Sequence, residues 1–137
     1  MIILDTNVVS EIIVDSGGTV AQKVASRREP VYITTVTLAE LWYGVELMQV
    51  GQRRQSLEER INVWVGKLGA EMLLPLDAKA AEPFGRLRAD RRKMGRPIPF
   101  ADAAIAAICA RHQATLYTRN TKDFDHTGIA LFNPWID

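Results

Sequence analysis

The chain alternates short apolar runs with longer segments whose apolar residues recur at helical spacing. Runs of roughly four to eight β-branched or aromatic residues are typical of buried strands, and apolar intervals of about three to four residues are typical of amphipathic helices. The predicted strands are residues 1–4, 31–36, 72–76, 115–118 and 129–132, and the predicted helices are residues 19–28, 37–50, 52–68, 77–93 and 100–112. Strands separated by helices favour an α/β fold with a small parallel sheet flanked by helices.

Length, charge and cysteine content narrow the class of protein. The 137 residues suffice for one domain, spanning 1–137, and a formal charge of +1 excludes both a polycation that coats nucleic acid and an acidic tail protein. The single cysteine, Cys109, cannot form an internal disulfide, which favours a reducing compartment. No apolar stretch reaches the roughly 20 residues of a membrane helix, and the N-terminus lacks the basic region of a signal peptide. We therefore expect a cytoplasmic protein that does not enter a membrane.

Polar side chains follow several predicted strands, at the edge of a parallel sheet where ligands usually bind. Asp5 follows the first strand, Glu40 lies one turn into the helix after the second, and Asp102 lies in the first turn of an alanine-rich helix. Asn120 and Asp123 follow the strand 115–118. These positions predict that three or four carboxylates gather at one edge of one sheet.

Each of these residues also has a structural explanation. Asp5 suits a turn after a strand, and Asn120 and Asp123 lie in a turn-like stretch. Residues 37–40 match a capping box, in which Glu40 would bond back to the first amide of its helix. Asp102 fits this kind of explanation less well, because at 100° per residue it lies in line with apolar residues of its helix, and a buried carboxylate needs a partner or a metal ion.

Crowded carboxylates repel one another unless a cation neutralises them, and hard oxygen ligands suit Mg²⁺ or Mn²⁺. Such ions, completed by water and phosphate oxygens, promote phosphodiester hydrolysis because they lower the pKa of a bound water. The acidic positions therefore predict a metal-dependent hydrolase. A different Mg²⁺-dependent nuclease or phosphatase, and a binding module without catalytic activity in a repressor complex, remain as alternatives.

Four segments in order resemble the PIN-domain ribonucleases, and especially the VapC and FitB toxins of prokaryotic toxin–antitoxin pairs. The segments are residues 1–11, residues 37–41 with Gly44, residues 100–107 and residues 118–124; residues 132–135 resemble the FitB-type ending. This resemblance implies a PIN-like fold and metal binding by Asp5, Glu40 and Asp102. The fourth acidic position falls on Asn120, where many relatives have aspartate, with Asp123 as the second candidate. The departure at Asn120 leaves both one and two bound metals open.

The resemblance also implies an activity and a set of partners. The expected activity is Mg²⁺- or Mn²⁺-dependent cleavage of single-stranded RNA from tRNA, rRNA or mRNA, in which Thr6 and Thr118 orient a carboxylate or a water. The expected partners are a cognate antitoxin and a second copy of the chain in a homodimer. A larger toxin–antitoxin oligomer, in which the antitoxin binds operator DNA, is also expected as an alternative assembly.

A cluster of basic residues precedes the helix that carries Asp102. Residues 86–96 contain six basic residues and only one acidic residue. Such clusters attract phosphate backbones, although a solvated helix face is the usual explanation for a run of charges. The predicted RNA contacts are Arg86, Arg88, Arg92, Lys93, Arg96 and Arg119, the last of which lies near the acidic positions.

Overall fold

Five parallel strands form one sheet in the order β3-β2-β1-β4-β5 in the computed structural model, which describes residues 1–137. The strands are β1 (Ile2–Leu4), β2 (Val31–Thr34), β3 (Leu73–Leu74), β4 (Thr115–Tyr117) and β5 (Ala130–Phe132). Because the strands are parallel, their carboxyl ends share one edge of the sheet. The predicted α/β class and parallel sheet are confirmed.

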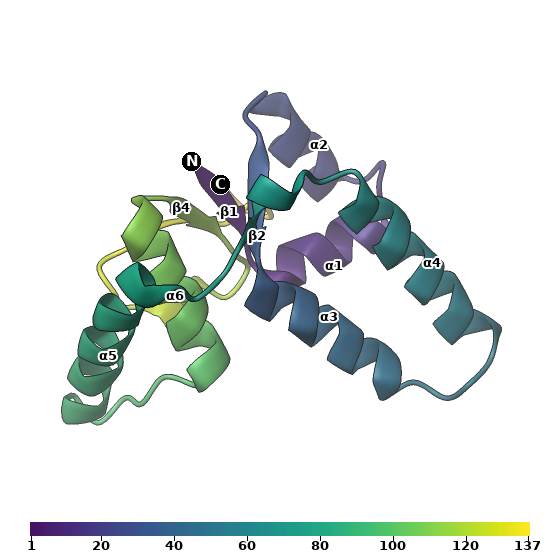
Figure 1. Cartoon of the computed structure of the whole chain (residues 1–137). Coiled ribbons are helices and arrows are strands. Elements are labelled where there is room, and N and C mark those ends of the chain that lie inside the picture. The colour runs from purple at the N-terminus through teal and green to yellow at the C-terminus, as the bar shows by residue number, and fades with distance from the viewer.

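Helices cover both faces of the sheet (Figure 1). The α-helices are α1 (Thr6–Val14), α2 (Thr19–Ser26), α3 (Thr35–Glu46), α4 (Gln52–Gly66), α5 (Ala78–Lys93) and α6 (Phe100–His112), and the 3₁₀ helices are η1 (Ala70–Met72) and η2 (Thr121–Phe124). Helices α1 to α4 lie on one side of the strands, whereas α5 and α6 pack together on the other (Figure 1). No helix is long and apolar enough to cross a bilayer.

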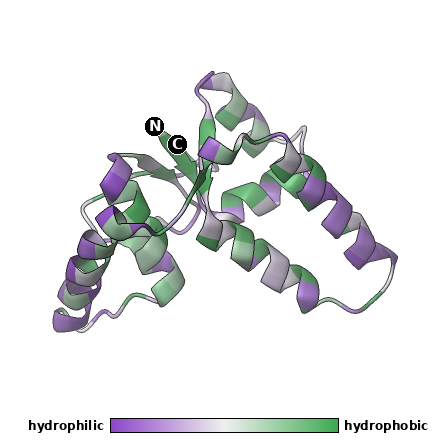
Figure 2. Ribbon diagram, viewed as in Figure 1, coloured by the Kyte–Doolittle hydropathy of each residue, from purple (hydrophilic) through white to green (hydrophobic).

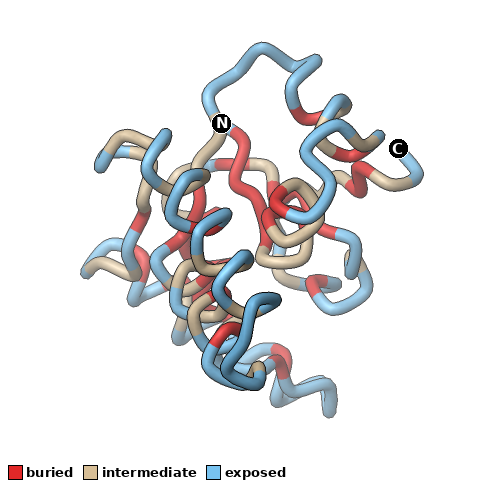
Figure 3. Tube along the Cα trace, turned by 90° about the vertical axis from the view of Figure 1, so that its right-hand side faces the viewer, coloured by how far each residue is buried: buried red, intermediate tan, exposed pale blue.

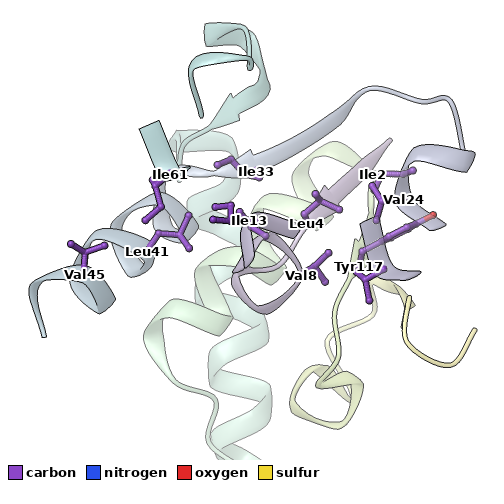
Figure 4. Packing of buried hydrophobic residues seen from close by; sticks show 12 residues of the cluster. Ile2, Leu4, Val8, Ile13, Val24, Ile33, Leu41, Val45, Ile61 and Tyr117 are labelled. Atoms are coloured by element: carbon purple, nitrogen blue, oxygen red, sulfur yellow. The ribbon is translucent and has the colours of Figure 1, made fainter. Parts of the chain in front are cut away.

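Two apolar clusters, one on each face, hold the helices on the sheet. The first joins β1 and β2 to helices α1 to α4 through side chains such as Leu4, Val8 and Leu41 (Figure 4). The second lies under α5 and α6 and includes Ile3, Ile105 and Leu116. Buried residues run through the centre of the molecule (Figure 3), while the helices α4 and α5 carry hydrophilic outer faces (Figure 2). Neighbouring residues of β1 thus supply both cores, as expected for a strand covered on both faces.

The structure differs from the sequence prediction most at α1, which was not predicted. Its sequence is rich in valine and isoleucine, which favour strands. The helix forms because Asp5 caps its first turn and because Val8, Val9 and Ile13 are buried in the core. The second strand also ends two residues earlier than predicted, because Thr34 caps α3 and the chain turns into the helix at once.

Candidate functional site

Asp5 lies at the carboxyl end of β1, and its two carboxylate oxygens have different hydrogen-bond partners. Its Oδ1 accepts a hydrogen bond from the Thr6 amide at 2.8 Å, which caps α1. Its Oδ2 accepts a bond from the Thr118 hydroxyl at 2.7 Å and one from the Asn7 side-chain amide at 3.2 Å. Burial raises the pKa of Asp5, and these donors partly offset that effect. The carboxylate is therefore fixed in place by strand, helix and neighbouring loop.

Glu40 faces Asp5 from α3, and it does not form the predicted capping box. The N-cap of α3 is Thr34, whose hydroxyl oxygen accepts the Thr37 amide at 3.0 Å. The capping-box explanation of Glu40 is therefore wrong, because the helix begins before Thr37. Instead, Glu40 Oε1 accepts a 2.6 Å hydrogen bond from the Thr6 hydroxyl. Thr6 thus links α1 to the Glu40 carboxylate.

Asp102 is the most perturbed carboxyl group of the site. It lies in the first turn of α6, which runs on as a continuous buried apolar segment from Ala103 to Cys109. The pKa of Asp102 is raised to about 6, mainly by burial and further by the charges of Asp5, Asp123 and Glu40, while Arg91 opposes the rise. Four acidic groups therefore repel one another across a small space, as the sequence predicts.

The loop after β4 contributes both candidates for the fourth position. Asn120 lies in the loop after β4, beyond Thr118 and Arg119, and donates its backbone amide to the Thr118 hydroxyl oxygen at 3.1 Å. Asp123 lies in η2, where its backbone amide bonds to the Asn120 carbonyl at 3.0 Å. Both residues line the same cleft as the other acids. The structure therefore brings Asn120 and Asp123 to the site together.

The resulting cleft has a volume of about 290 Å³ and a mostly polar lining. Its lining residues are Asp5, Thr6, Asn7, Ser10, Glu40, Asp102, Asn120, Asp123 and Phe124. No three of the acidic side chains lie close enough together to enclose an ion by themselves. One or two carboxylates plus waters and phosphate oxygens are nevertheless the usual shell of Mg²⁺. The donor set thus fits a hydrated hard cation.

The basic residues that were predicted to contact RNA differ in whether their charges are already paired within the protein. Arg86 pairs with Glu82 at 2.6 Å and Arg96 lies 3.8 Å from Asp125, whereas Arg88 stacks beside the ring of Phe100. Arg92 and Lys93 are exposed in the last turn of α5. The charge run is therefore only partly a free basic surface.

Sequence reasoning missed Asn7 and Arg91. Asn7 contacts Asp5, Thr118 and the backbone of Arg119, so it joins three parts of the site. The pattern that could have identified Asn7 is the polar set Thr6, Asn7 and Ser10, whose helical spacing places them on one face. This pattern can be recognised only if the segment is known to be a helix. Arg91 belongs to the basic run but is buried and bonds to three backbone carbonyls.

The raised pKa of Asp102 predicts a stability that depends on pH in the absence of divalent cations. A carboxyl group whose folded pKa is raised costs no stability below about pH 4, and its cost grows as pH rises through about 6 and then levels off. We expect Asp102→Asn to raise the free energy of unfolding by about 1–2 kcal/mol at pH 7.5, allowing for solvent screening, and to change it little at pH 4. Urea denaturation in EDTA at both pH values measures this.

The matched control for this measurement is Asp90→Asn, which removes an exposed aspartate of α5 that has no salt bridge. It should leave the pH dependence of stability as it is in the wild type. If wild type and Asp102→Asn showed the same pH dependence of stability, the pKa of Asp102 would not be raised in the folded protein.

The sequence and the structure are similar to known proteins over nearly their whole length. The PIN domain pattern matches residues 2–130. The toxin FitB of Neisseria gonorrhoeae (strain ATCC 700825 / FA 1090) is 37% identical over 139 residues, which cover 100% of both chains. The VapC ribonuclease Y4jK of Sinorhizobium fredii (strain NBRC 101917 / NGR234) is 34% identical, with 98% of each chain covered.

The fold is also similar to that of a solved structure, FitAB bound to the IR36 DNA fragment. The TM-score is 0.85 at 34% sequence identity, and the match covers 98% of this chain and 96% of the other. The similarity therefore includes every element that builds the cleft.

Proposed function

The chain belongs to the PIN domain family, and from that premise we propose that it is the toxin of a toxin–antitoxin system and acts as an endoribonuclease on single-stranded RNA. The observation that carries the proposal is the cleft at the carboxyl edge of the sheet, where Asp5, Glu40, Asp102 and Asp123 come together beside Asn120. A site of this kind suits hydrolysis of a phosphodiester, because it has hard oxygen donors and no cysteine, histidine or lysine to form or activate a nucleophile. Burial raises the pKa of the Cys109 thiol, which excludes that residue as a nucleophile.

We propose Mg²⁺ or Mn²⁺ as the cofactor, bound among Asp5, Asp102 and Glu40 with either Asn120 or Asp123, by one or two carboxylates directly and by the other side chains through water. Burial and the repulsion by neighbouring acids together raise the pKa of Asp102, which supports this assignment, since a divalent cation offsets both. When bound, such an ion activates a water for in-line attack at phosphorus, which leaves 5′-phosphate and 3′-hydroxyl ends.

The other residues of the cleft orient the carboxylates. The Thr118 hydroxyl and the Asn7 amide both donate to Oδ2 of Asp5, and the Thr6 hydroxyl donates to Glu40. Each donor fixes one carboxylate oxygen and leaves the remaining lone pairs free for a cation, as hydrogen-bond partners of metal-binding carboxylates do. Arg88, Arg92, Lys93 and Arg96 supply positive charge along α5 and the turn that follows it, for the RNA backbone.

We further propose that the chain pairs with a cognate antitoxin and with a second copy of itself, and that operator DNA binds through the antitoxin. The similarity to FitAB bound to DNA supports this. Exposed apolar side chains also suit contact with a protein partner, because burial of their surface stabilises a complex. They lie on α1, α3, α4 and the loop after α3, namely Val14, Tyr43, Leu47, Val50 and Val63.

The proposed function is tested with purified chain and four substrates: single-stranded RNA, single-stranded DNA, flap DNA and a small phosphate ester. We expect cleavage of the RNA alone in Mg²⁺ or Mn²⁺, no cleavage in EDTA, and recovery when the cation is restored. Cleavage that persists in excess EDTA would refute the cofactor. A preference for flap DNA or the phosphate ester would indicate a different hydrolase that uses the same acidic site, and not an endoribonuclease.

A further inference from the structure

The segment that follows β5 is bonded to the loop beside Asp5. Asn133 is buried, and its side-chain amide donates to the Arg119 carbonyl at 3.3 Å, while its Oδ1 accepts the Trp135 backbone amide at 2.9 Å. One residue earlier, the Phe132 carbonyl accepts the Thr118 amide at 2.9 Å. Residues 132–135 therefore hold residues 118–119 in position.

Arg119 lies between two residues that build the cleft. Thr118 bonds to the Asp5 carboxylate, and Asn120 lines the cleft. The Arg119 amide itself donates to Oδ1 of Asn7 at 3.1 Å, and the other end of that Asn7 side chain donates to Asp5. One side chain thus connects the Arg119 backbone to the Asp5 carboxylate.

The Arg119 guanidinium is oriented but not neutralised. Its central carbon lies 4.7 Å from the centre of the Trp135 ring, the shortest arginine–aromatic distance in the structure. It makes no salt bridge, unlike Arg86 and Arg96 of the basic run. Stacking on an aromatic ring restricts a guanidinium while leaving its N–H groups free for an anion.

We propose that Arg119, on the loop that borders the acidic cleft, is a phosphate-binding residue for single-stranded RNA, and that Trp135 is the positioning residue that holds its guanidinium. The inference rests on the proposed function. An RNA strand that enters a cleft of four acids is repelled, and a cation fixed beside that cleft offsets the repulsion at the neighbouring phosphate. The planar guanidinium matches two phosphate oxygens at once, which explains why a restrained arginine serves here.

The test measures binding of a fluorescein-labelled single-stranded RNA oligonucleotide by fluorescence anisotropy in EDTA, over a range of KCl concentrations. We expect Arg119→Gln to weaken binding about three- to tenfold and to reduce the salt dependence of log Kd by about 0.7, the share of one phosphate contact on a single strand. Trp135→Leu should weaken binding about two- to fivefold in the wild type and have no further effect in Arg119→Gln. In cleavage assays, both variants should raise KM and leave kcat within about twofold.

Two variants and one stability measurement separate positioning from a merely structural role. Trp135→Phe keeps an aromatic ring and should bind RNA as the wild type does, while thermal unfolding shows whether Trp135→Leu remains folded. The matched control is Arg27→Gln, since Arg27 is also exposed and stacked, 4.9 Å from the Phe132 ring, but does not bond to residues of the cleft. It should keep wild-type RNA affinity.

Three results would overturn the inference: an equal loss of binding in Arg27→Gln, additive effects of the Arg119 and Trp135 substitutions, or unchanged affinity in Arg119→Gln. Failure of the wild type to cleave RNA in Mg²⁺ or Mn²⁺ would instead overturn the proposed function on which the inference rests.

Discussion

Replacing Asp5 and Asp102 together by asparagine is expected to lower the rate of RNA cleavage at least about 10³-fold while the protein stays folded. Each substitution removes a negative charge from a site whose only catalytic resource is a cluster of oxygen donors, and a loss of about 4 kcal/mol of transition-state stabilisation corresponds to that factor. Asparagine keeps the size of the side chain and one acceptor oxygen, which can accept the bond from the Thr6 amide, while the Thr118 hydroxyl can reverse and accept a bond from the new side-chain amide. The expected loss therefore reports charge rather than shape.

The measurement has an enzymatic and a cellular part. Cleavage of a single-stranded RNA is followed with purified wild type and double variant, with thermal unfolding as the control for folding. Conditional expression in a bacterial host, with sequencing of RNA 5′ ends, should give growth arrest and a dominant cut site with the wild type alone. Growth arrest that persists in the double variant would indicate a binding module rather than an enzyme.

The position of the site could be predicted from the sequence because it depends on a topological rule. In a parallel sheet, the residues that follow neighbouring strands meet at one edge, so Asp5 after β1 and Asn120 after β4 have to lie close together. Glu40 reaches the same edge from the second turn of α3, and Asp102 reaches it from the first turn of α6. The charge of Asp102 was also predictable as partly buried, since its helix offers no other acidic residue on any face.

Other parts of the site depend on contacts that no local pattern reveals. Residues 37–40 match a capping box, yet Thr34 is the N-cap, because the strand ends two residues earlier than predicted and the Thr34 hydroxyl oxygen accepts the Thr37 amide. Asn7 reaches Asp5 and the Arg119 amide because its segment is a helix, and that valine- and isoleucine-rich segment is helical through tertiary packing rather than local preference. Arg91 looked like one more solvated charge of the basic run, because burial of a single side chain cannot be inferred from a run of like charges.

Arg91→Met is expected to lower the free energy of unfolding by about 3 kcal/mol, because Arg91 is a buried cation whose donors satisfy the backbone on two sides. Its Nε donates to the Arg96 carbonyl at 2.8 Å, and its Nη1 donates to the carbonyls of Asp123 and Asp125, both at 3.0 Å. The side chain thus ties the end of α5 to the turn after it and to η2. Urea denaturation measures the loss, and amide hydrogen exchange should show η2 opening more often.

The adjacent Arg92→Met is the matched control, since it removes the same charge from an exposed position of the same helix and should change stability by less than about 0.5 kcal/mol. Arg91→Lys should fall between the two, because an ammonium keeps the charge but lacks the fork that reaches carbonyls on both sides. Loss of Arg91 should also slow RNA cleavage, since η2 carries Asp123 and the cation offsets the repulsion around Asp102. Equal stability of the Arg91 and Arg92 variants would mean that η2 is held by the packing of Phe124 rather than by the arginine.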